Sequence, residues 1–182
     1  MATTPIFEPD NTNELLRGWL LHAHKGRDRH DVAARRCDRQ RYLIGIPATV
    51  AAAVVGTSTF AALQGSPTRV VQVLVGVLAI VSAILSSLQS FLDLGARAER
   101  HRIASVKYKT VIRRMEQMGI GTIQDLALDS PVLDELRQTL DALEEEMPVV
   151  APSVYDHVEA KYRDRDFVDS VLNPAKRTSE HR

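Results

Sequence analysis

Four side chains that can form hydrogen bonds lie close together in a stretch of the sequence that is otherwise apolar. They are Ser82, Ser86, Gln89 and Ser90. Offsets of four, seven and eight residues from Ser82 place them on one side of a helix. In a membrane, such groups bond to a neighbouring helix or, in an oligomer, line a water-filled path. We regard all four as candidates for lining a path, and packing between helices remains the alternative.

Arrangements typical of catalysis or metal binding are not found in the sequence. It holds no Gly-rich phosphate loop, and no serine or cysteine nucleophile has a plausible histidine and aspartate setting. The chain is therefore predicted not to be an enzyme and to need no cofactor. The spacings of His22, His24, His30 and Cys37 match no zinc pattern, so no metal site is predicted. Because Cys37 is the only cysteine, an internal disulfide is excluded.

The polar side chains belong to the second of two uncharged, mostly apolar runs. No Asp, Glu, Lys or Arg occurs in the 27 residues between Arg41 and Arg69 or in the 23 residues from 70 to 92. Since a helix rises about 1.5 Å per residue, helices over 42–63 and 70–92 would each cover about 33 Å. The hydrocarbon core of a bilayer is about 30 Å thick, so each run is long enough to span it.

A short connection joins the two runs. It contains Gly65 and Pro67, which favour a turn, and its six residues force the two helices to lie antiparallel and adjacent. We therefore predict an all-α membrane protein with a two-transmembrane hairpin over 42–92 and long cytoplasmic helical extensions. A soluble helical bundle is the alternative, because the first run is rich in Ala, Gly and Thr. However, neither run has the polar face that helices on the outside of a soluble bundle keep.

Small residues recur along one face of each predicted span. In lipid, such residues allow helix backbones to approach closely. They either close the hairpin itself or join several copies, and a conducting form would require a homo-oligomer because one hairpin has too few helices to enclose a channel. The residues predicted to pack helices are Gly45, Thr49, Ala52 and Gly56 in the first span, and Gly76, Ala79 and Ala83 in the second.

Basic residues gather on both sides of the predicted hairpin. Residues 1–114 hold 16 Lys and Arg against 8 Asp and Glu, whereas residues 115–182 hold 7 against 15. Lys and Arg mark the cytoplasmic side of membrane spans and the turn holds only Arg69, so both termini are predicted to be cytoplasmic. The basic residues expected at the surface of the bilayer are Arg35, Arg36, Arg39, Arg41, Arg97, Arg100 and Arg102.

The remaining segments are assigned around the hairpin. We predict a disordered lead over 1–11, a basic amphipathic cytoplasmic helix over 12–41, the hairpin over 42–92, cytoplasmic helices over 93–147, and a C-terminal helix with a charged tail over 148–182. The second span is expected to continue as a helix beyond Leu92, because no proline interrupts the sequence up to Met118. Ser153 is expected to cap a last helix that ends near Leu172.

A further helix is predicted from Ser130 and Pro131, a cap followed by proline at the first helical position. Apolar residues then recur at spacings of three and four, which is typical of a coiled coil or a packed bundle. This seam is too short to hold an assembly alone, so we expect it to pack on 17–41 or 97–114. Its residues are Leu133, Leu136, Leu140, Leu143 and Met147.

Several short motifs, in this order, resemble the SLATT family, the SMODS- and SLOG-associating two-transmembrane effectors of bacteria. Besides the hairpin and the helix that contains Trp19, the motifs are Arg39-Gln40-Arg41-Tyr42, Leu88-Gln89-Ser90-Phe91-Leu92, Ala98-Glu99-Arg100-His101-Arg102 and Lys107-Tyr108. The resemblance covers about residues 12–150 and leaves 149–182 as the segment least like the family.

This resemblance implies a multi-pass protein of the bacterial inner membrane that forms a pore or disrupts the membrane in anti-phage or conflict systems. A nucleotide-sensing partner protein would signal invasion, and the infected cell would stop growing or die. The resemblance implies no enzyme activity, and no nucleic-acid partner is expected. A membrane-anchored scaffold that conducts nothing is the alternative function.

Overall fold

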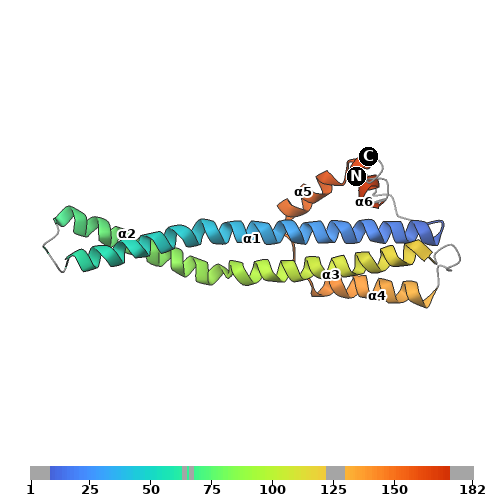
Figure 1. Cartoon of the computed structure of the whole chain (residues 1–182), viewed down its shortest axis with the longest axis horizontal. Helices are drawn as coiled ribbons and strands as arrows, with labels where there is room; N and C mark the ends of the chain where they lie inside the picture. Colours follow the sequence, from blue (N-terminus) through green and yellow to red (C-terminus); the bar gives the residue numbers. More distant parts are fainter. Residues whose placement is uncertain (1–8, 63–64, 66–67, 122–129, 173–182) are drawn as a thin grey trace, which may run out of the picture. The chain divides into compact units, whose positions relative to one another are not determined.

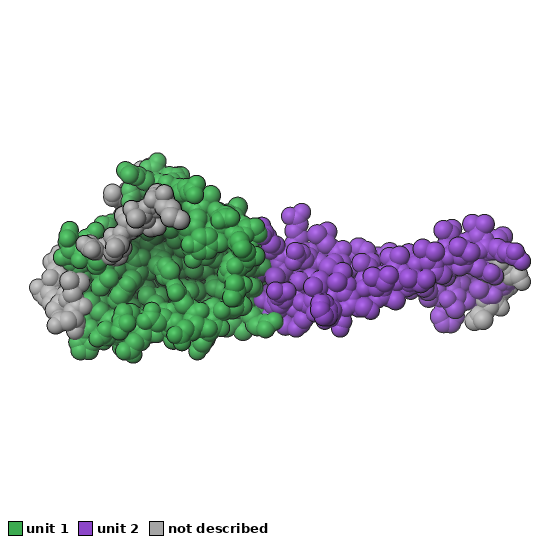
Figure 2. Space-filling model, turned by 180° about the vertical axis from the view of Figure 1, so that it is seen from behind, with its two compact units in different colours: residues 1–33, 100–182 green, residues 34–99 purple. Residues whose placement is uncertain are grey.

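In the computed structural model, the described residues are 9–62, 65, 68–121 and 130–172, and their regular elements are all α-helices (Figure 1). The predicted all-α fold is thereby confirmed. The helices are α1 (Thr12–Ala62), α2 (Arg69–Leu92), α3 (Leu94–Gly121), α4 (Pro131–Glu146), α5 (Pro152–Lys161) and α6 (Arg165–Leu172). They divide into two compact units, of which unit 1 comprises residues 1–33 and 100–182 and unit 2 comprises residues 34–99 (Figure 2).

Unit 2 contains the hairpin of the second half of α1 and α2. Its surface is strongly apolar: the exposed fractions are 59% for Ile46, 73% for Phe60, 64% for Val73 and 62% for Ile80. Only 11% of the most apolar stretch of α1 is buried within the chain, and only 6% of the most apolar stretch of the helix that begins at Arg69. Soluble proteins rarely expose contiguous apolar surface on this scale. Both helices are long and apolar enough to cross a membrane, as predicted.

Unit 1 is built around a core that α1, α3 and α4 share. Figure 1 shows α3 beside the first half of α1 and α4 beside α3. The predicted seam of α4 packs on both neighbouring helices, and Trp19 and Met147 lie against this core partly buried. The core residues are Leu16 and Ala23 of α1, Tyr108, Val111, Ile112 and Met115 of α3, and Leu133, Leu136, Leu140 and Leu143 of α4.

Side chains cap the starts of α1 and α4. The side chain of Asn11 accepts a hydrogen bond from the backbone N–H of Glu14 at 2.9 Å, at the start of α1. At the start of α4, the Ser130 hydroxyl accepts from the N–H of Leu133, and Pro131 occupies the first helical position.

Two expectations about helix ends were wrong. The helix does not continue past Leu92, because Asp93 adopts a left-handed conformation with φ of 42° and separates α2 from α3. Aspartate tolerates this conformation better than most residues do. The last helix is also divided, since α5 ends at Lys161 and the Asp164 carboxylate accepts from the N–H groups that begin α6. Ala151, rather than Ser153, is the N-cap of α5, because Pro152 takes the first helical position.

Parts of several predicted segments lie outside the described residues. They are most of the disordered lead (1–8), part of the hairpin turn (63–64 and 66–67), the segment 122–129, and the charged tail (173–182).

Candidate functional site

Ser82 joins the two helices of the hairpin. Its side chain is buried, and its hydroxyl donates a hydrogen bond to the backbone carbonyl of Ala48 at 3.1 Å. Ala48 and Ala51 of α1 are also buried. Small residues at these positions allow α2 to approach close enough for the bond. In the single chain, the Ser82 hydroxyl thus bonds to the neighbouring helix.

Gln89 lies where the helices approach closely again. A Cβ atom placed on Gly45 would be only 3.2 Å from both the nitrogen and the oxygen of the Gln89 amide. Gly45 therefore makes room for this amide within the hairpin.

A polar cavity of about 380 Å³ opens at the end of the hairpin where Arg41 and Asp93 lie. Three of the four candidate path residues line it, namely Ser86, Gln89 and Ser90, whereas Ser82 does not. Leu94 and Gly95 complete the lining together with Arg41 and Asp93. The Arg41 guanidinium reaches across to α3, where its nearest atom would lie 3.5 Å from a Cβ atom on Gly95. The left-handed residue Asp93, which was not predicted from the sequence, thus belongs to the candidate site.

An apolar recess of about 310 Å³ shares Arg41 and Gln89 with the polar cavity. It extends along α1, and most of its lining is apolar. The remaining lining residues are Tyr42, Gly45, Ile46, Thr49 and Val50.

Most of the predicted packing residues lie outside the contact between α1 and α2. Thr49, Ala52, Gly56, Gly76 and Ala83 are exposed, and Ala79 is half-buried. A Cβ atom on Gly56 or Gly76 would meet nothing within 4 Å. Their role in packing remains a prediction, which concerns contacts with other chains. The buried alanines Ala48 and Ala51 were missed, although they follow Gly45 at spacings of three.

The predicted membrane-surface arginines are all exposed. They are Arg35, Arg36, Arg39 and Arg41 of α1, and Arg97, Arg100 and Arg102 of α3. Cys37, among the arginines of α1, is a free and half-buried thiol.

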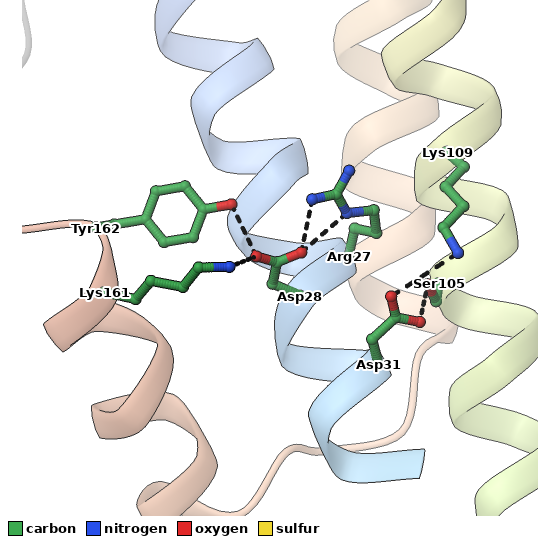
Figure 3. A network of polar contacts seen from close by, with 7 residues as sticks. All are labelled: Arg27, Asp28, Asp31, Ser105, Lys109, Lys161 and Tyr162. Carbon is green, nitrogen blue, oxygen red and sulfur yellow. Dashed lines mark hydrogen bonds and ion pairs between the residues drawn. The ribbon is translucent and has the colours of Figure 1, made fainter. Parts of the chain in front are cut away.

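In unit 1, ion pairs hold α5 against α1. Lys25 and Arg29 both donate to the Glu159 carboxylate, at 2.9 and 2.5 Å. Asp28 accepts from Arg27, Lys161 and the Tyr162 hydroxyl (Figure 3). Burial raises the pKa of Asp28, but the hydrogen bonds from Arg27 and Lys161 outweigh burial and hold the pKa below its usual range.

A second polar group in Figure 3 joins α1 to α3. The Ser105 hydroxyl donates to the Asp31 carboxylate at 2.6 Å, and Lys109 lies 3.8 Å from the other carboxylate oxygen. The acidic end of α4 contacts the basic helices as well, since His22 bonds to Glu144 and Lys107 to Glu146.

Unit 1 also contains the buried histidines His24, His30 and His101. The Nδ1 atoms of His30 and His101 are 2.9 Å apart, and the His30 ring stacks on Tyr108. His24 is buried, and neither of its ring nitrogens has a hydrogen-bond partner among the described residues. Burial, together with Arg27, lowers the pKa of His24 to about 4. Burial, together with His101 and Arg29, lowers the pKa of His30 to about 4.

The buried histidines His30 and His101 contact one another, and His30 also contacts Tyr108. Within the described residues, no three His, Cys, Asp or Glu side chains are grouped so as to hold a metal ion. The His30–His101 pair joins residues 71 apart in the chain, a distance at which the sequence offers no signal.

A family model matches most of the chain. The model of SMODS and SLOG-associating 2TM effector domain family 4 matches residues 16–161, which extend from the first helix to the last residue of α5. No curated protein and no solved structure matches the chain.

Proposed function

The chain belongs to the SMODS and SLOG-associating 2TM effector domain family 4, and on this premise we propose that it is an oligomeric effector that permeabilises a bacterial inner membrane. In this proposal a nucleotide-sensing partner protein signals infection, both termini are cytoplasmic, and the effector acts without catalysing a reaction. The family and the two apolar helices make it a two-transmembrane protein. Conduction and assembly are the additional steps that we propose.

The observation that carries the proposal is the open surface of the hairpin. Ala48, Ala51 and Ser82 are buried within the hairpin, whereas the faces that contain Gly56 and Gly76 are open. In a bilayer, helices associate through such small-residue faces rather than through apolar bulk, which lipid solvates equally well. These faces therefore support contact between hairpins of different copies.

The polar side chains of α2 support a conducting path. Ser86 and Ser90 are exposed and line an open polar cavity, and Gln89 lies beside them. In lipid an exposed polar side chain has no partner, so in an oligomer these groups would face water or a neighbouring helix. We propose that they line the narrow part of the path near the cytoplasmic side.

Induced expression with a membrane-potential dye tests conduction. Strong overexpression favours assembly by mass action without the partner's signal, so the parent should depolarise cells and arrest their growth. Replacing Ser86 and Gln89 with Leu should abolish both effects, because Leu favours the bilayer and dewets a narrow path. Ser87→Leu is the matched control, since Ser87 is also exposed on α2 but does not line the cavity.

The alternative is a membrane-anchored scaffold that conducts nothing. The hydrogen bond from Ser82 to Ala48 and the close packing of Gln89 on Gly45 are the observations that favour it. A parent that inserts but does not depolarise cells under this overexpression would contradict conduction and favour the scaffold. If the double variant is as toxic as the parent, the polar residues serve packing, and a path would run along another face.

A further inference from the structure

The polar cavity combines one cation, one anion and neutral hydrogen-bonding groups. Arg41 supplies the cation, Asp93 the anion, and Ser86 and Ser90 the hydroxyls. In the part of the chain that the structure describes, neither Arg41 nor Asp93 forms an ion pair. An arginine that binds a phosphate and a carboxylate that binds an ammonium group would both be paired by one zwitterionic ligand.

The position of the cavity along the chain indicates where such a ligand would come from. Arg41 directly precedes the first uncharged run, and Asp93 directly follows the second. In a two-transmembrane protein, these residues lie at the depth of the lipid headgroups. Basic pockets between membrane helices at this depth are typical headgroup sites.

The adjoining apolar recess indicates that the ligand is amphipathic. It shares Arg41 and Gln89 with the polar cavity and is lined by Ile46 and Val50, which belong to the first span. A charged group in the cavity and a hydrocarbon chain in the recess would belong to the same molecule.

We propose that the cavity binds the headgroup of a zwitterionic, amine-bearing phospholipid of the phosphoethanolamine class. Its phosphate binds Arg41 and the hydroxyls of Ser86 and Ser90, its ammonium group binds Asp93, and an acyl chain lies in the recess. An anionic headgroup would leave the Asp93 carboxylate unpaired beside the ligand, which is costly at the edge of a bilayer. A choline headgroup has a cation but no N–H to donate to the carboxylate.

Native mass spectrometry of the full chain, released from detergent, tests the proposal. The detergent contains phosphatidylethanolamine, phosphatidylcholine and phosphatidylglycerol with identical acyl chains. The parent should retain phosphatidylethanolamine in preference to the other two lipids. Arg41→Gln should lower this retention about tenfold, which corresponds to the loss of about 1.4 kcal/mol of binding. Arg39→Gln, an exposed arginine outside the cavity, is the control and should keep the parent's preference for phosphatidylethanolamine over the other two lipids.

Asp93→Asn tests the contact to the ammonium group separately. Asparagine tolerates the left-handed backbone of this position, so the end of α2 should be preserved. The preference for phosphatidylethanolamine over phosphatidylglycerol should fall to about one, because the neutral amide no longer attracts the ammonium group. Equal retention of the three lipids by the parent, or unchanged retention by the Arg41 variant, would overturn the proposal.

A last arm distinguishes a lipid from a soluble phosphoethanolamine compound. Glycerophosphoethanolamine in millimolar excess should leave the lipid bound, because the soluble compound lacks the chain that fills the recess. Its displacing the lipid at micromolar concentration would show that the ligand is soluble and would contradict the lipid assignment. The inference rests on the membrane spans of the proposed function and not on conduction, so the dye assay and the lipid assay can fail independently.

Discussion

Acidification should destabilise unit 1 through two buried histidines, His24 and His30. In the folded chain each has a pKa of about 4, against an ordinary value of 6.5. Between these two values the unfolded chain binds protons that the folded chain does not bind. The stability that the two neutral rings contribute is therefore fully present above pH 6.5, and it is lost as the pH falls through 6.5 towards 4.

The size of the effect follows from the same two values. The difference between the folded and unfolded pKa lowers the free energy of unfolding by about 3 kcal/mol for each ring once the pH has fallen below both values. At pH 5 the loss is about 2 kcal/mol for each ring. The charged groups facing His24 are Arg27 and Asp28, whereas His30 faces His101, Arg29 and Asp31. Arg27 and Arg29 oppose protonation of the adjacent rings, and Asp28 and Asp31 favour it. Together the two histidines should lower the free energy of unfolding by about 4 kcal/mol between pH 7.5 and 5.

Trp19 makes the measurement direct. It is the only tryptophan, and it packs partly buried against the core of unit 1, so its fluorescence reports the unfolding of this unit. Urea titrations of the full chain in detergent at pH 7.5 and 5 give the two free energies of unfolding. The urea midpoint should fall on acidification.

Substitution of His24 separates the two rings. His24→Leu should remove about 2 kcal/mol of the pH dependence. It should not weaken the chain at pH 7.5, because the ring nitrogens it removes have no hydrogen-bond partner among the described residues. His157→Gln is the matched control, since His157 is exposed on α5. If the parent has the same urea midpoint at both pH values, or if His24→Leu keeps the full pH dependence, the reasoning from burial is refuted.

Three further predictions concern topology, assembly and packing. A reporter active only in the periplasm should work when inserted at Ser66 and fail at either terminus, and activity at a terminus would contradict the predicted orientation. Gly56→Leu should shift native mass spectra from oligomer to monomer, because it places a bulky side chain on an open small-residue face, and an unchanged oligomer would show that this face contacts lipid. Gly26→Ala should lower the free energy of unfolding by about 1–3 kcal/mol, since its Cβ atom would lie 2.7 Å from the buried ring of Tyr108. Gly56→Ala meets no atom and lies in unit 2, so it should leave the midpoint that Trp19 reports for unit 1 unchanged.

The elements could be predicted from sequence where one local signal determines the outcome. The absence of charge over two runs longer than a bilayer is thick indicates the hairpin without any tertiary knowledge. Ser130 with Pro131 begins α4, and the leucine spacing that follows gives its buried face. In each case the physical cause lies within a few residues of its effect.

The site could not be predicted to the same extent, because its geometry depends on contacts between distant residues. The left-handed Asp93 requires only a single residue to change conformation, and its neighbours in sequence are compatible with a continuous helix. Glu159 contacts Lys25 across 134 residues, so the attachment of α5 to α1 leaves no periodic pattern. The contact within the hairpin selects Ala48 and Ala51 from among many small residues, a choice that only the crossing of the two helices determines.

Conduction and lipid binding would use the same polar residues of α2, and this constrains when each can occur. The Ser82 hydroxyl already donates its hydrogen bond to Ala48 within the hairpin, so neither process requires a new partner for it. Ser86 and Ser90, in contrast, line the open cavity. A headgroup held there by Arg41 and Asp93 would satisfy them in a single chain, whereas in an oligomer they would face water or a neighbouring helix. Oligomerisation through this face must therefore displace the lipid, and the affinity of the cavity for its headgroup opposes assembly by the free energy of that binding.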